Sequence, residues 1–88
     1  MGENCSCGYV MALRLAQRVA SAPEVQQVLT KHGCLIRTRL GLHEIGGDFC
    51  AEDGLIILQL CAPEAEVEKL KSDLTAVNGV TVKTMCLS

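Results

Sequence analysis

An almost uninterrupted apolar run in the second half of the chain constrains the fold more than any other feature. Residues 54–61 contain Leu55-Ile56-Ile57-Leu58, and Gln59 is the polar interruption. A short run of this kind behind a glycine predicts a central strand with both faces covered. The chain must therefore supply or recruit apolar surface for two sides of a sheet.

Three further segments alternate polar and apolar residues with the period of two that half-buried strands have. They comprise residues 9–19, 34–42 and 80–87. In the middle segment, strict alternation puts Ile36, Thr38, Leu40 and Leu42 on one face, and Leu35, Arg37 and Arg39 on the other. Residues 43–53 contain Gly46 and Gly47 together with several acids, which predicts a long hairpin loop.

Two helices are predicted between these strands. Ser21 caps the first helix, which begins at Pro23 and ends at Gly33 in the left-handed conformation. The second helix begins at Pro63 and ends at Asn78-Gly79. Its apolar residues recur at helical spacings and form one buried face: Val67, Leu70, Leu74 and Val77.

The predicted elements follow the order strand, helix, strand, strand, helix, strand. Two right-handed crossovers joined by a hairpin fold into a four-stranded antiparallel sheet with both helices on one face. We therefore predict an α+β, ferredoxin-like βαββαβ sandwich over residues 9–88, preceded by a flexible tail of residues 1–8. A chain of 88 residues has room for one core and no second domain.

The sheet face opposite the helices is predicted to carry a mixture of aliphatic and basic side chains. By strand alternation these are Val10, Ala12, Arg14, Leu35, Arg37, Arg39, Leu55, Ile57, Gln59 and Lys83. An exposed apolar face with a polar rim is typical of an interaction surface, and a second copy of the chain is the simplest partner. We expect a homo-oligomer, a dimer or tetramer, with an interface formed by Leu35, Arg37, Leu55 and Ile57.

Composition argues against several classes of partner. Aromatic residues are 2% of the chain and the formal net charge is −2. Nucleic-acid binding depends on clustered positive charge and on aromatic stacking, so we expect no direct contact with nucleic acid. No apolar run approaches the ~20 residues of a membrane span, and the N-terminus lacks the order of a secretory signal. We therefore expect a cytoplasmic protein without a membrane partner.

Six cysteines are distributed along the chain: Cys5, Cys7, Cys34, Cys50, Cys61 and Cys86. Three of them lie within predicted strands among leucine and isoleucine, where a free cysteine behaves as a small apolar residue. Disulfides are rare in proteins that are not secreted. The sequence therefore favours reduced thiols over a disulfide framework.

Three stretches give the sequence a resemblance to a known family. They are Lys31-His32-Gly33-Cys34-Leu35-Ile36-Arg37-Thr38-Arg39-Leu40-Gly41-Leu42, Asp53-Gly54-Leu55-Ile56-Ile57-Leu58, and Gly79-Val80-Thr81-Val82-Lys83-Thr84. Over residues 9–87 the chain resembles the iron-only hydrogenase system regulators. These are small ferredoxin-like proteins of the ACT-like group, related in fold to the C-terminal domain of nickel-responsive repressors. The resemblance implies an oligomer of ACT-like domains that senses a ligand, and this chain has no DNA-binding helices.

The residues themselves allow two kinds of binding site. An effector in the ACT manner would lie near the end of the strand 34–42, where Gly41 permits close approach and Arg37, Arg39 or His43 meets an anion. Alternatively, His43 and Cys50 in the loop supply an imidazole and a thiolate that suit a transition metal. A purely structural interaction domain is the third alternative.

Catalysis is not expected from this sequence. It has no glycine-rich phosphate loop, no paired carboxylates on a rigid element and no nucleophile with an evident base. Cys50 and His43 form the one conceivable nucleophile and base pair, and a long loop is a poor support for that geometry. We therefore predict a regulatory, ligand-sensing module that is not an enzyme and holds no cofactor.

Overall fold

The computed structural model describes residues 5, 7–16, 18–42 and 54–87, and for residues 18–21 and 42 it describes the backbone. The elements in chain order are β1 (Tyr9–Leu15), α1 (Arg18–Lys31), a 3-10 turn η1 (Gly33–Leu35), β2 (Ile36–Leu42), β3 (Gly54–Leu60), α2 (Glu64–Thr75) and β4 (Val80–Cys86).

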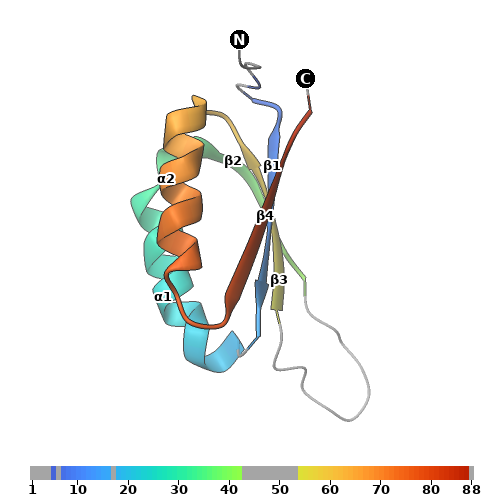
Figure 1. Cartoon of the computed structure of the whole chain (residues 1–88). Helices are drawn as coiled ribbons and strands as arrows, with labels where there is room; N and C mark the ends of the chain where they lie inside the picture. The colour runs from blue at the N-terminus through green and yellow to red at the C-terminus, as the bar shows by residue number, and fades with distance from the viewer. Residues whose placement is uncertain (1–4, 6, 17, 43–53, 88) are drawn as a thin grey trace.

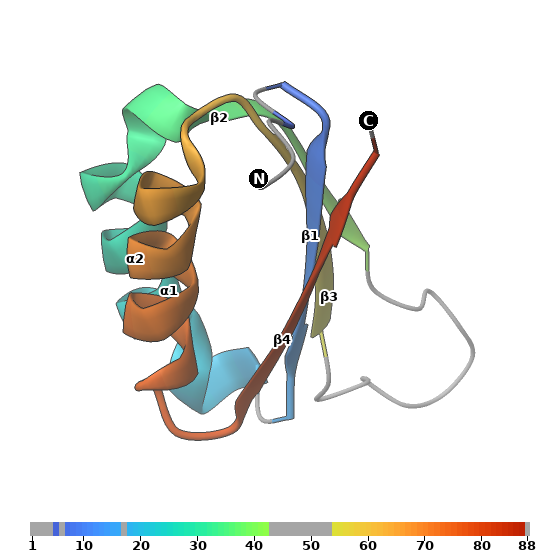
Figure 2. The same ribbon diagram turned by 45° about the horizontal axis from the view of Figure 1, so that its top comes forward.

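The four strands form one antiparallel sheet in the order β2-β3-β1-β4. Both helices pack on the same face of this sheet, and the opposite face has no helix over it (Figures 1 and 2). The apolar run Gly54–Leu60 is a central strand, as predicted. This arrangement confirms the ferredoxin-like α+β fold.

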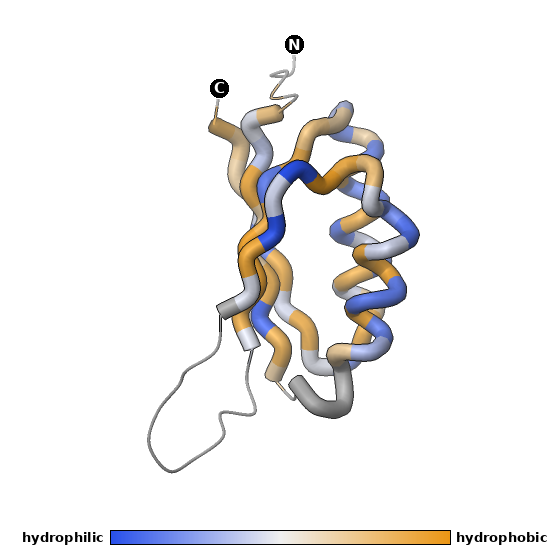
Figure 3. The backbone as a smooth tube through the Cα atoms, turned by 180° about the vertical axis from the view of Figure 1, so that it is seen from behind, coloured by the Kyte–Doolittle hydropathy of each residue, from blue (hydrophilic) through white to orange (hydrophobic). Residues whose placement is uncertain are grey.

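The core lies between the sheet and the two helices. Alternate residues of β1 point toward the helices and are buried, whereas the residues between them are partly exposed. The predicted apolar face of α2 is buried against this layer, with Leu70 and Leu74 fully enclosed. Hydrophobic residues are frequent along the strands, whereas hydrophobic and hydrophilic stretches succeed one another along the helices (Figure 3). The largest fully buried side chains are Met11, Leu13, Leu15, Leu29, Leu58, Leu60, Leu70, Leu74, Val25 and Val67.

The first helix differs from its prediction at both ends. It begins at Arg18, so Pro23 lies inside it and the strand before it ends at Leu15 instead of Val19. Proline lacks an N–H, so at this position it removes one bond of the helical ladder. Gly33 opens the 3-10 turn, and the described glycine with a positive φ is Gly79, at 82°. The left-handed stop predicted at Gly33 is therefore wrong.

A β-bulge interrupts the pairing of β2 with β3. Ile36 is opposite Leu60 and Thr38 is opposite Gln59, so Arg37 is an extra residue with no paired residue on β3. Side chains alternate strictly only in a regular strand, and one extra residue moves every later side chain to the other face. Strict alternation was assumed for residues 34–42, and beyond the bulge that prediction is wrong.

Two predicted positions change face for this reason. Arg39 is opposite the buried Leu58 and its guanidinium donates a hydrogen bond to Gln26 of α1, so it lies on the helix side of the sheet. Leu40, predicted to be buried, lies on the uncovered face. Leu35 precedes the strand altogether and packs against the core from η1. The predicted interface position of Leu35 is therefore wrong.

Candidate functional site

The uncovered face of the sheet carries a continuous group of aliphatic side chains, called here the open-face patch. The strand register brings its members into neighbouring rows, because Leu40 is opposite Ile57, Ile57 is opposite Ala12, and Val10 is opposite Met85. Large members of the patch are strongly exposed: Leu40 by 52%, Met85 by 55% and Leu55 by 39%. The open-face patch consists of Val10, Ala12, Leu40, Leu55, Ile57 and Met85.

Basic residues lie on the same face. Lys83 is opposite Ala12, and Arg14 is opposite both Leu55 and Thr81. The patch therefore has an aliphatic centre and a basic border along β1 and β4. Leu55 and Ile57 lie where the sequence placed them, whereas Leu40 and Met85 are members that sequence analysis missed. The signal for Leu40 was hidden by the bulge, whereas Met85 alternates with Lys83 on the same side of its strand and was only left out of the predicted set.

A second candidate site lies on the helix side of the sheet at the edge strand β2. We call it the edge-strand site. It consists of Gln26, Arg39 and Gly41. The Arg39 guanidinium donates a hydrogen bond to the Gln26 side-chain oxygen, which is a neutral acceptor. A Cβ built on Gly41 would meet no atom of the described residues within 4 Å, so these residues leave the space beside the strand open. The edge-strand site therefore presents a cationic group next to free space.

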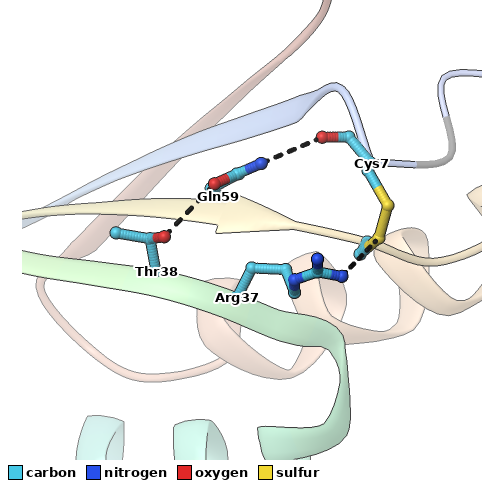
Figure 4. Close-up of a disulfide and its surroundings, with 5 residues drawn as sticks. Cys7, Arg37, Thr38 and Gln59 are labelled. Carbon is cyan, nitrogen blue, oxygen red and sulfur yellow. Dashed lines mark hydrogen bonds between the residues drawn. A yellow bond between two sulfur atoms is a disulfide. The ribbon is translucent and has the colours of Figure 1, made fainter.

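Arg37 does not join the edge-strand site. Its Nη1 atom lies 3.5 Å from the Sγ atom of Cys61, at the other end of β2 (Figure 4). The predicted group of Arg37, Arg39, Gly41 and His43 is thus divided by the bulge, with Arg39 and Gly41 on one side and Arg37 on the other. His43 lies outside the described residues, as does Cys50 of the proposed metal pair.

Four of the six cysteines are paired in the structure. Cys5 is bonded to Cys86 and Cys7 to Cys61, while Cys34 is free and exposed. The prediction of reduced thiols is therefore wrong for these four residues. The physical reason is long-range, because the N-terminal segment folds back onto the ends of β3 and β4, which local sequence patterns do not reveal.

Backbone hydrogen bonds hold this N-terminal segment in place. The Leu87 N–H donates to the Gly8 carbonyl at 2.9 Å, and the Gly8 N–H donates to the Cys5 carbonyl. The Gln59 side-chain nitrogen donates to the Cys7 carbonyl at 3.2 Å (Figure 4). Cys5, Cys7 and Gly8 were assigned to a flexible tail, yet they are attached to the domain by these bonds and by the two disulfides.

One polar contact joins the two helices. Nε2 of His32, which follows α1, lies 2.8 Å from Oδ2 of Asp73 in α2, and Lys31 Nζ lies 3.5 Å from the same oxygen. The hydrogen bond with His32, reinforced by the charge of Lys31, holds the pKa of Asp73 below its ordinary value against the opposing effect of partial burial. This contact gives His32 a structural role, because it joins the end of α1 to α2.

The described residues show neither a metal-ligand cluster nor a membrane-spanning helix. Residues 5, 7–16, 18–42 and 54–87 contain no cluster of three or more His, Cys, Asp or Glu side chains that could hold a metal ion. None of the helices in these ranges is long and apolar enough to cross a membrane.

Comparisons with known proteins give similarity in structure only. No model of a known protein family matches the chain, and no curated protein matches it. The uncharacterized protein TM1266 from Thermotoga maritima superposes with a TM-score of 0.80 at 22% identity, over 91% of this chain and 95% of that chain.

Two other solved structures show the same architecture. CPII, a nitrogen regulatory PII-like protein from Thiomonas intermedia K12, bound to ADP, AMP and bicarbonate, has a TM-score of 0.51 at 17% identity, over 91% of each chain. A formyltetrahydrofolate deformylase from Pseudomonas putida KT2440 has a TM-score of 0.57 at 10% identity, over 90% of this chain and 28% of that one. These proteins share the ferredoxin-like fold with this chain. Because the identities are so low, the comparisons show the fold alone.

Proposed function

We propose that this chain is a small regulatory module that self-associates through the open-face patch and senses a small anion at the edge-strand site. The observation that carries the proposal is the exposure of the patch. Leu40, Leu55 and Met85 are 39–55% exposed on the sheet face that no element of the described residues covers. Covering apolar surface is worth roughly 25 cal/mol per Å², and exposed aliphatic patches with a polar rim are typical of interaction surfaces.

A second copy of the chain is the partner that we propose for the patch. In a twofold interface the same surface is used by both subunits, so one aliphatic face covers the other without a different protein. The basic border formed by Arg14 and Lys83 would then lie at the rim, where water screens like charges. The apolar run of β3 is in this way covered on its second face, as its sequence requires.

A regulatory role is supported by two resemblances. Residues 9–87 resemble the iron-only hydrogenase system regulators, and the fold is shared with CPII, a PII-like regulatory protein. Regulation of an iron-only hydrogenase is the narrower form of the proposal and depends on the first resemblance alone. We also propose that the protein acts in the cytoplasm, without catalysis and without direct contact with nucleic acid.

The anion is assigned to the edge-strand site because of its charge and its open space. The Arg39 guanidinium contacts the neutral Gln26 amide and so keeps its positive charge available for a carboxylate or phosphate. Gly41 leaves room for a ligand to approach the backbone of β2. His43, which follows this strand in the sequence, is a further candidate ligand within the same proposal.

Light scattering coupled to size exclusion tests self-association. The wild-type protein is expected to have a mass of two or more 9.4 kDa chains at about 100 μM, a concentration well above typical specific dissociation constants. Leu40→Glu places a charge in the centre of the patch and is expected to weaken association at least about tenfold, which corresponds to about 1.4 kcal/mol. Ala65→Glu adds the same charge to an exposed position of α2 and should leave the mass unchanged. A monomeric wild-type protein would remove the proposal.

Thermal unfolding in the presence of small anions tests the sensor. The panel is ADP, AMP, acetate and bicarbonate, the molecules bound in the CPII structures. A ligand present at about 100 times its dissociation constant adds about 2.7 kcal/mol of stability, so one member is expected to raise the melting temperature by several degrees. Arg39→Ala should abolish that rise, and Arg37→Ala, on the other side of the bulge, should not. A flat response across the panel would count against the edge-strand site.

A further inference from the structure

We propose that the Cys7–Cys61 disulfide is a thiol-exchange site. At this site a low-molecular-weight thiol such as glutathione attacks Cys7, and Cys61 leaves as a thiolate beside the Arg37 guanidinium. The site shares no residue with the open-face patch or the edge-strand site, and it stands whether or not the protein self-associates.

The two disulfides differ in the sulfur that must leave. In the Cys5–Cys86 bond the exposed residue is Cys86, and its partner Cys5 is only 6% exposed within the core. A thiolate is disfavoured in apolar surroundings, so Cys5 is a poor leaving group. In the Cys7–Cys61 bond the exposed residue is Cys7, and its partner Cys61 is half-buried with a cation beside it.

The position of Arg37 favours release of Cys61. Its Nη1 atom donates to the Cys61 Sγ atom at 3.5 Å, as Figure 4 shows. A neighbouring arginine lowers the pKa of a thiol, and a disulfide is cleaved faster when the departing thiol has a lower pKa. Because Arg37 is the extra residue of the β-bulge, its side chain is aimed at this end of the sheet instead of following the alternation of β2.

The exchange is balanced in two steps. In the first, the attacking thiolate forms a bond to Cys7 Sγ, the bond between the two cysteines breaks, and its electron pair goes to Cys61 Sγ. In the second, another thiol attacks the mixed disulfide and releases Cys7. Two small thiols are oxidised to one disulfide, the protein disulfide is reduced, and the protons of the two thiols end on Cys7 and Cys61.

The location of Cys7 gives the exchange a structural consequence. Its carbonyl accepts a hydrogen bond from Gln59 Nε2 at 3.2 Å, and the Gln59 side-chain oxygen accepts one from Thr38 at 3.2 Å. Gln59 is opposite Val10, a member of the open-face patch. A glutathione group on Cys7 would therefore lie at the border of that patch.

Peptide mapping by mass spectrometry tests this inference. The full chain is first equilibrated with oxidised glutathione, then treated with a series of reduced glutathione concentrations, trapped by alkylation and digested. The Cys7–Cys61 bond is expected to open at a lower glutathione concentration than the Cys5–Cys86 bond. The mixed disulfide with glutathione is expected on Cys7 and not on Cys61.

Variants of Arg37 separate its charge from its bulk. Arg37→Ala is expected to slow opening of the Cys7–Cys61 bond at least about threefold, the effect of one pKa unit at a Brønsted coefficient of about 0.5. Arg37→Lys should retain most of the rate because it retains the cation. Lys69→Ala is the control, since it removes an exposed cation of α2 outside the proposed sites, and its rate should equal that of the wild type.

Four results would overturn the inference. They are free thiols at Cys7 and Cys61 after oxidation, earlier opening of the Cys5–Cys86 bond, the glutathione adduct on Cys61, and an unchanged rate in Arg37→Ala. None of these measurements depends on the mass of the assembly, so failure of self-association and failure of thiol exchange remain distinguishable.

Discussion

Gly8 is the residue at which the N-terminal segment meets the end of the chain, and a methyl group has no room there. A Cβ built on Gly8 would run into the carbonyl oxygen of Leu87 and would lie 3.1 Å from that of Cys5. Both obstacles are backbone atoms that Gly8 itself holds, through the Leu87 N–H to its carbonyl and through its own N–H to Cys5. They cannot move away without breaking those hydrogen bonds.

Gly8→Ala is expected to lower the free energy of unfolding for two reasons: the new methyl group clashes with backbone atoms, and the hydrogen bonds at Gly8 are disturbed. Forcing an extra carbon into a filled space typically costs about 1–3 kcal/mol. A backbone hydrogen bond contributes about 0.5–1.5 kcal/mol, and at least one of the two at Gly8 must lengthen or break. We therefore expect a loss of about 2–4 kcal/mol in the free energy of unfolding, or a fall of about 8–30 °C in melting temperature for a domain of this size.

Urea unfolding followed by far-UV circular dichroism is the suitable assay, because the chain has one Tyr and no Trp. Gly41→Ala is the matched control, since a Cβ there meets no atom of the described part of the chain within 4 Å and its φ is not positive. Alanine in an element interior is favoured over glycine by about 0.5–1 kcal/mol, so this control should be neutral or slightly stabilising. A Gly8→Ala protein within about 0.5 kcal/mol of the wild type, the range of ordinary surface changes, would refute the reasoning.

Three further predictions concern stability. Because its folded pKa is lowered, Asp73 stabilises the protein above its ordinary pKa and loses this effect as pH falls through the lowered value. Asp73→Asn should therefore be less stable than wild type at pH 6, and the two urea midpoints should converge as the pH falls through the lowered pKa of Asp73; a constant difference would exclude the His32 contact as the cause. The double variant Cys5→Ser/Cys86→Ser removes a link between residues 81 apart and should lower the free energy of unfolding by about 2–4 kcal/mol, whereas unchanged stability to urea would contradict a closed bond. Deletion of Arg37 should cost less than about 1 kcal/mol, because Ile36 and Thr38 are already opposite adjacent residues of β3, and loss of cooperative unfolding would show that the bulge is required.

The fold could be predicted because the core imposes its periods on the sequence. Val67, Leu70 and Leu74 are spaced as a helix requires and are buried in α2 as predicted. The alternation over residues 9–19 likewise predicted a half-buried strand, and Met11 and Leu13 lie on the buried side of β1. These signals are local, and the order of the elements then leaves few ways to join them.

The disulfides could not be predicted in this way. Cys7 and Cys61 are 54 residues apart in the sequence, and their pairing depends on how the N-terminal segment returns to the sheet. No local pattern specifies that return. Apolar neighbours of Cys61 in the sequence favoured a buried thiol, whereas Cys61 follows the last residue of β3 and lies half-buried at the end of the sheet.

The two parts of the candidate site depend on the same extra residue. Without a bulge, Arg37 and Arg39 would share one side of β2 and Leu40 would point into the core. With Arg37 unpaired, Leu40 moves to the uncovered face and Arg39 reaches α1, while Arg37 meets Cys61. A bulge leaves the hydrophobic pattern of the sequence unchanged, since it adds a residue to one strand and alters only which partner each residue faces. The exposure of Leu40 on the aliphatic face and the cation beside the disulfide are therefore two consequences of one local insertion, and both become visible only when the pairing with β3 is known.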